Sequence, residues 1–115
     1  MLVLYLTRSR KPENELHNEP GRPLPPRACA DIATWSGTRI TLRGWLAASR
    51  RVRTTAGTWM RFLTLEDESA LAEAILFPDV YTRTAPRVRS DEVLLVSGTV
   101  EDQMGSFALR VENIW

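Results

Sequence analysis

The chain has 115 residues, 43% of them hydrophobic, and its 15 Lys and Arg residues nearly balance its 14 Asp and Glu residues. This length suits one domain and is too short for a polymerase or a TIM barrel, and a net charge of +1 argues against a protein that coats nucleic acid through general basicity. One cysteine and one histidine exclude an intrachain disulfide and a four-ligand Cys/His zinc site, so we expect no metal and no cofactor.

The first part of the chain is rich in proline. Five of the seven prolines lie between residues 12 and 26, among Asn, Glu and Gly residues. Such a composition buries too little apolar surface to form a core. We therefore predict that residues 1–30 form an extended arm or linker and that residues 31–115 form the folded domain. No apolar run suits a membrane span or a signal sequence, so we expect a cytoplasmic protein with no membrane partner.

From residue 39 onward, apolar and polar residues alternate with the period of two that marks strands with one buried face. The predicted strands cover residues 39–46, 58–66, 71–77, 93–100 and 106–114, and a short helix begins at Pro78. Gly44 predicts a bulge or bend in the first strand, and we expect its neighbour Trp45 to lie in the core. Five strands with a helix between the third and fourth indicate an all-β, five-stranded OB-fold, a Greek-key barrel.

The charge is unevenly distributed. Residues 32–65 contain six arginines and no acidic residue, whereas residues 66–115 contain four arginines and ten acidic residues. We predict that residues 49–57, with three arginines in four positions, form the loop between the first two strands. Residues 66–68 are expected to form a solvated acidic turn, and the strip from Glu66 to Glu73 is expected to repel phosphate and set one edge of a basic groove.

Arginine suits phosphate because its guanidinium presents a planar fork of donors. Aromatic residues among such cations supply stacking surfaces for the bases of a single strand, and the first interstrand loop belongs to the binding surface of OB-folds. Phe62 is the best stacking candidate because it is out of phase with Leu63 and Leu65. The candidate nucleic-acid-binding residues are Arg43, Arg50, Arg51, Arg53, Trp59, Arg61 and Phe62.

Two segments carry a family resemblance: residues 62–68 (FLTLEDE) and residues 77–81 (FPDVY). Together with Gly44-Trp45-Leu46 and the arginine-rich segment, they resemble the OB domain near the C-terminus of the bacterial DNA polymerase III alpha subunit and its error-prone relatives. The resemblance implies a role in DNA replication or repair synthesis. It does not imply catalysis, because two-metal phosphoryl transfer needs clustered aspartates and the five aspartates here are scattered along the chain.

In looser form, the same segments resemble the anticodon-binding OB domains of class II aminoacyl-tRNA synthetases. In that family, the aromatic residue matching Phe62 stacks on a base, and the polar residue matching Glu73 reads a base edge. The resemblance therefore adds Glu73 to the candidate residues, as an acceptor for a base donor.

The sequence thus predicts a non-catalytic module that binds single-stranded DNA. Two alternatives stay open. The barrel could be a protein-interaction module that docks on a polymerase or another replication protein, with the arginines facing an acidic partner, or it could bind RNA or tRNA.

Overall fold

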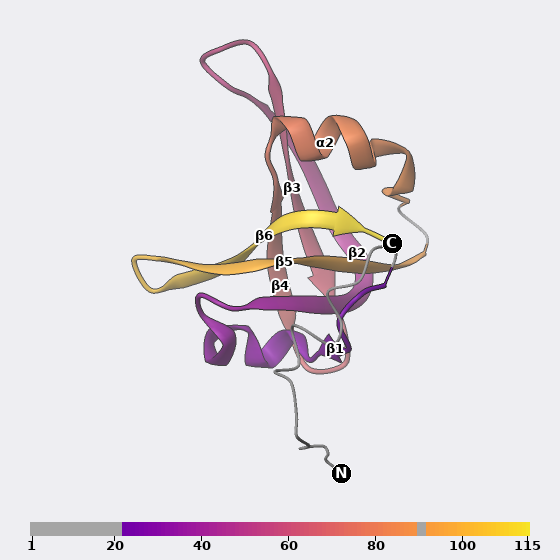
Figure 1. Cartoon of the computed structure of the whole chain (residues 1–115), viewed down its shortest axis with the longest axis vertical. Coiled ribbons are helices and arrows are strands. Elements are labelled where there is room, and N and C mark those ends of the chain that lie inside the picture. Colours follow the sequence, from indigo (N-terminus) through magenta and orange to yellow (C-terminus); the bar gives the residue numbers. More distant parts are fainter. Residues whose placement is uncertain (1–21, 90–91) are drawn as a thin grey trace.

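The computed structural model describes residues 22–89 and 92–115, and Figure 1 shows the course of the chain. A two-residue strand and a 3₁₀ helix over Cys29–Trp35 precede five longer strands. One short α-helix, α2 (Pro78–Thr84), follows β4 and leads into a 3₁₀ turn over Ala85–Arg87. The strands are β1 (Pro26–Arg27), β2 (Arg39–Arg53), β3 (Trp59–Glu66), β4 (Leu71–Leu76), β5 (Val93–Gln103) and β6 (Ser106–Ile114).

The five long strands form a closed barrel. Their order is β2-β3-β4-β6-β5, and β5 pairs back with β2, while β1 adds a short parallel edge to β2. The β4–β6 pairing is parallel and the other long pairings are antiparallel. The five-stranded OB-fold barrel that the sequence predicts is confirmed, with its helix between the third and fourth long strands.

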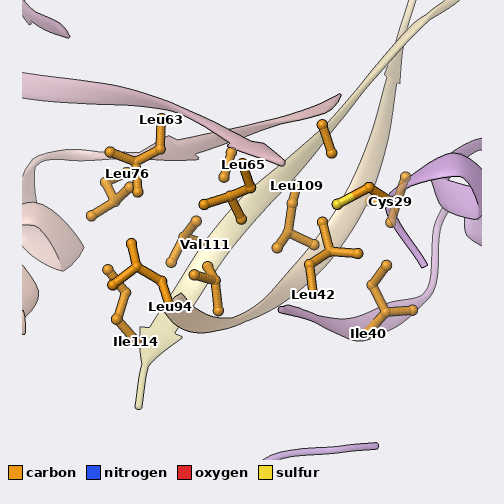
Figure 2. Packing of buried hydrophobic residues seen from close by; sticks show 14 residues of the cluster. Cys29, Ile40, Leu42, Leu63, Leu65, Leu76, Leu94, Leu109, Val111 and Ile114 are labelled. Atoms are coloured by element: carbon orange, nitrogen blue, oxygen red, sulfur yellow. The ribbon is translucent and has the colours of Figure 1, made fainter. Parts of the chain in front are cut away.

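The core lies inside the barrel and is built by the predicted alternation. Leu63 and Leu65 are fully buried, whereas Phe62 and Thr64, which alternate with them along β3, point outward and are partly exposed. Figure 2 shows residues from every long strand converging on one cluster. Each fully buried aliphatic side chain contributes roughly 1.5–3 kcal/mol by leaving water, so this cluster is the main source of stability.

Two glycines allow the strands to approach closely enough for the barrel to close. A Cβ at Gly44 would lie 2.8 Å from the carbonyl oxygen of Glu66, and a Cβ at Gly98 would lie 2.1 Å from that of Arg110. The sequence predicts a bulge or bend at Gly44. The register shift of β2 falls between Leu46 and Ala48, so the bulge lies after Gly44, and Gly44 itself allows the close backbone contact with Glu66.

Part of the segment before residue 31 lies against the barrel. Pro26 and Arg27 pair with β2, and Cys29 points into the core cluster (Figure 2). The predicted division of the chain at residues 30 and 31 stays a prediction, since residues 1–21 lie outside the described residues.

The segment that the sequence predicts as an arginine-rich loop is mostly strand, which corrects that prediction. β2 continues to Arg53, and β3 begins at Trp59, so only residues 54–58 form the turn. The two strands extend past α2 as a two-stranded ribbon at the top of Figure 1. We call residues 49–61 the hairpin arm. The prediction failed because the arm has no buried side and therefore lacks the apolar alternation that marks a strand.

Candidate nucleic-acid interface

A row of side chains crosses the outer face of the sheet at the base of the hairpin arm. Arg50 on β2 pairs with Phe62 on β3, Phe62 pairs with Ile75 on β4, and Ile75 pairs with Arg110 on β6. Directly paired residues point to the same face, so these four side chains are neighbours. Two apolar side chains thus lie in the middle of the row, the partly exposed Phe62 and the buried Ile75, with an arginine at each end.

Both arginines of this row lie over aromatic rings. The guanidinium carbon of Arg50 is 4.6 Å from the centroid of Phe62, and that of Arg110 is 4.0 Å from the centroid of Phe77, which precedes α2. Contacts of this kind at exposed sites contribute about 0.5–1 kcal/mol. They are weak enough for a ligand to displace the cation from the ring. Arg110 also lies 3.7 Å from Glu101.

The next row of the same face holds a hydrogen-bonded polar pair. Thr64 and Glu73 are paired across β3 and β4, and the Thr64 hydroxyl donates to Oε2 of Glu73 at 3.1 Å. An exposed carboxylate and hydroxyl offer acceptors and a donor beside the aromatic ring. We call Arg50, Phe62, Thr64, Glu73, Ile75 and Arg110 the outer surface.

The remaining arm residues of the candidate set point to the opposite face of the ribbon. Arg51 pairs with Arg61, and Arg53 pairs with Trp59, one position out of phase with Arg50 and Phe62. The guanidinium carbons of Arg51 and Arg53 lie 4.5 and 5.3 Å from the Trp59 centroid. We call Arg51, Arg53, Trp59 and Arg61 the inner arm cluster.

Arg61 ties the base of the arm to the barrel. Its Nε donates to the hydroxyl of Ser49 at 2.7 Å, and its guanidinium carbon lies 5.7 Å from the ring of Tyr81 on α2. Arg61 therefore lies on the side of the ribbon that faces α2. At the other end of the arm, Thr54 and Thr58 close the turn through a 2.7 Å hydroxyl contact.

The arm arginines form no ion pair with the acidic residues that the structure describes. Among the described residues, the ion pairs join Arg39 to Glu112 and Arg110 to Glu101, and none involves an arginine of the arm. Arg51 and Arg61 are like charges in directly opposite positions, which is unfavourable for the ribbon by itself. The arm is therefore a concentration of positive charge that the described part of the protein does not neutralise.

The structure does not bring Arg43 together with the other candidates. Arg43 precedes Arg50 by seven residues on β2, which is about 20 Å of extended strand. It lies beside Trp45, Glu66 and Glu68, around a hollow at the end of the barrel away from the arm. Trp45 is 55% exposed, so its predicted place in the core is wrong. Its side chain points outward from β2, where none of the described elements covers it.

The acidic turn also has a structural role that the sequence does not reveal. Oδ2 of Asp67 accepts the backbone N–H of Cys29 at 2.9 Å, and Oδ1 accepts bonds from Ser69 and Ala70. Burial by itself would raise the pKa of Asp67, but these hydrogen bonds to the ionised form outweigh it and hold the pKa well below its usual range. Asp67 thus anchors Cys29 to the barrel, and the hydroxyl oxygen of Ser69 accepts the backbone N–H of Ala30 at 3.0 Å.

The thiol of Cys29 is affected by the same contact. Burial and the adjacent Asp67 carboxylate raise the pKa of Cys29 to about 12, so the thiol stays protonated at neutral pH. Within the described residues, no group of three His, Cys, Asp or Glu side chains is placed to hold a metal ion. No helix in that part of the chain is long and apolar enough to cross a membrane.

Sequence reasoning missed Ile75, Phe77 and Arg110. Ile75 and Arg110 lie 35 positions apart and meet only through the parallel β4–β6 pairing. The apolar–polar alternation of β6 predicts that Arg110 points outward. It does not predict that β4 is the strand beside β6.

Residues 40–115 match the family model of the OB-fold nucleic acid binding domain. Among curated relatives, an error-prone DNA polymerase of Anaeromyxobacter dehalogenans (strain 2CP-C) is 34% identical over 91 residues, which are 79% of this chain and 7% of the relative. A DNA polymerase III subunit alpha of Bacillus subtilis (strain 168) is 33% identical over 63 residues, 55% of this chain and 6% of the relative. The chain therefore spans only a small part of the curated relatives that it matches.

Two solved structures share the fold. An asparaginyl-tRNA synthetase from Pyrococcus horikoshii, complexed with asparaginyl-adenylate, matches with a TM-score of 0.62 and 18% identity, over 80% of this chain and 22% of that one. The second OB-fold domain of replication protein A from Methanococcus maripaludis matches with a TM-score of 0.53 and 19% identity, over 70% of this chain and 84% of that one. At these identities the likeness concerns the fold alone.

Proposed function

Because the chain belongs to the family of OB-fold nucleic acid binding domains, we propose that it binds single-stranded DNA on its outer surface, in support of DNA synthesis. The observation that carries this proposal is the Arg50–Phe62–Ile75–Arg110 row, which has an apolar, aromatic centre and a cation at each end. The relatives named as DNA polymerases support the choice of DNA and of a role in replication or repair synthesis.

In the proposed complex, a base stacks on Phe62 and displaces the guanidinium of Arg50 from the ring. A stacked base contributes about 1–3 kcal/mol. The displaced guanidinium then reaches the flanking phosphate, to which it can donate two parallel hydrogen bonds. Arg110 can do the same at the other end of the row.

Thr64 and Glu73 lie one row away from Phe62, within the reach of the edge of a stacked base. The carboxylate of Glu73 accepts and does not donate, so it favours a base that presents an amino group. The pair gives the surface a preference among bases, while stacking and phosphate contacts supply most of the affinity.

We propose that the chain performs no reaction of its own. It spans 7% of the length of the error-prone polymerase that it matches, and Asp67 is engaged by backbone and serine donors. Its role is to hold the strand, and any partner among replication proteins would bind elsewhere on the barrel.

A fluorescence-anisotropy titration tests the proposal, with a labelled oligo-dT strand at low and at moderate salt. We expect Phe62→Ala to weaken binding by about 5- to 150-fold, which corresponds to the loss of one stacked base. The matched control is Trp45→Ala, another exposed aromatic residue on the outside of the barrel, which should leave the affinity unchanged.

Two further ligands separate the alternatives. A single-stranded RNA of the same length or a tRNA that binds more tightly than the DNA would overturn the choice of DNA. Absence of binding to any of these strands at low salt would overturn the nucleic-acid role and favour a protein partner.

A further inference from the structure

We infer that the inner arm cluster is a second phosphate-binding surface that takes the backbone of double-stranded DNA, separate from the outer surface that holds a single strand. Arg51, Arg53 and Arg61 point to the face of the ribbon opposite Arg50 and Phe62. A strand lying flat on the outer surface therefore cannot contact them, and their charge is left for another ligand segment.

The chemistry of the inner arm cluster suits phosphates better than bases. Two guanidinium groups already lie over Trp59, at 4.5 and 5.3 Å from its centroid. The cluster contains no carboxylate, amide or hydroxyl to read a base edge, in contrast to Thr64 and Glu73 on the outer surface. Guanidinium groups can each donate two parallel hydrogen bonds to a phosphate, and contacts of this kind position a protein on the backbone without reading the base sequence.

The shape of the arm suits a duplex. A two-stranded ribbon can enter the major groove, which is about 12 Å wide. From Ser49 to Arg53 the arm is about 13 Å long, at about 3.3 Å per residue. Residues 54–58 at its tip (TTAGT) are small or uncharged. The arm projects beyond α2, so its tip stands clear of the barrel (Figure 1).

The charge balance of the arm supports the same inference. Arg51 is placed directly opposite Arg61, and none of the ion pairs of the described residues neutralises either of them. A phosphate between these two guanidinium groups would turn an unfavourable pair into a favourable contact. With a single strand on one face and a duplex on the other, the protein would prefer a junction between the two.

The test compares three ligands by anisotropy: a single strand, a blunt duplex and a duplex with a single-stranded overhang. We expect the Arg51→Ala/Arg53→Ala double variant to lose about tenfold or more in duplex affinity at low salt, and the slope of log K against log salt to fall by about 0.9 for each lost phosphate contact. Its affinity for the single strand should stay within about twofold, because that ligand lies on the other face.

Two matched variants sharpen the test. Phe62→Ala should weaken single-strand binding and leave duplex binding intact, and Arg51→Lys/Arg53→Lys should keep much of the duplex affinity because it keeps the charge. Failure of the unchanged protein to bind the duplex, or an equal loss for single strand and duplex in the Ala double variant, would overturn the inference. Duplex binding without single-strand binding would support it while refuting the function proposed above.

Discussion

The barrel and the hairpin arm are built from the same pair of strands, yet the face that is buried in one is charged and exposed in the other. In the barrel, the inward positions of β3 are Leu63 and Leu65, which are fully buried. In the arm, the same face carries Arg61 and Trp59, opposite Arg51 and Arg53. The period of two runs unbroken through both halves of β3. What differs is whether other strands cover the face, so the ribbon is free to carry charge only where the barrel ends.

The largest expected change in stability follows from a substitution in the core of the barrel. Leu65→Ala removes a fully buried side chain and should lower the free energy of unfolding by about 2–5 kcal/mol, through lost transfer energy and a residual cavity. Urea denaturation followed by tryptophan fluorescence measures it. The control is Leu71→Ala at a site that is 59% exposed, which should change stability by no more than about 0.5 kcal/mol. Equal losses for the two variants would contradict the described core.

A smaller effect is expected at the anchor of residues 29 and 30. Asp67→Asn weakens charge-assisted bonds from Cys29 and Ser69 and should lower the free energy of unfolding by about 1–2 kcal/mol at pH 7. Because folding lowers the pKa of Asp67, its contribution is present above the unfolded carboxyl pKa of about 3.9 and is lost as pH falls below that value.

The pH dependence of the free energy of unfolding tests whether Asp67 is ionised in the folded protein. Unfolding of the unchanged chain and of Asp67→Asn should be compared between pH 7 and pH 2. The difference between them should shrink below about pH 4, where the carboxyl of the unfolded chain becomes protonated. A difference that stays constant over this range would contradict an ionised anchor.

The turn of the arm should respond more weakly. Gly57 has φ of +86° and no atom of the protein closer than 3.9 Å to a Cβ placed there, so the cost of Gly57→Ala is backbone strain alone, about 1–2 kcal/mol. At Gly98 in the barrel, the same change would place the Cβ 2.1 Å from a backbone oxygen and should cost more. Thermal unfolding of the two variants ranks them, and a larger loss at Gly57 would contradict the comparison.

The smallest expected effect is a difference between two variants of the arm. Arg51→Ala and Arg53→Ala each remove a contact with Trp59, but only Arg51→Ala also removes one of two like charges in directly opposite positions. The free energy of unfolding of Arg51→Ala should therefore exceed that of Arg53→Ala by a few tenths of a kcal/mol, about 0.2–1 at most, at low salt. This difference should vanish at high salt, because screening already weakens the repulsion. Denaturation at two salt concentrations measures it. A lower free energy of unfolding for Arg51→Ala than for Arg53→Ala at low salt would contradict the repulsion.

Much of the fold could be predicted from the sequence because short-range patterns determine it. The alternation of Leu63 and Leu65 with Phe62 and Thr64 is visible in the chain, and so is the proline that begins α2. The acid-free stretch of residues 32–65 likewise located the basic region. These features depend on neighbours within a few positions, where the chemistry of one strand or turn decides the outcome.

The candidate site was predicted less completely. Arg50 and Arg51 are adjacent in the sequence, yet they lie on opposite faces because the segment is strand and not loop. Trp45 is exposed because none of the described elements covers the outside of β2 at that position. Arg110 joins Phe62 only through Ile75 and the β4–β6 pairing.

By itself, the sequence determined the strand pattern, the basic region and the aromatic residue that points away from the core, because a period of two and local charge need no knowledge of distant segments. Only the tertiary structure decided which side chains share a surface. Closure of the barrel pairs β4 with β6, and the core ends where β2 and β3 leave the barrel as the arm. The pairing of β2 with β3 divides the arginines of the arm between two faces.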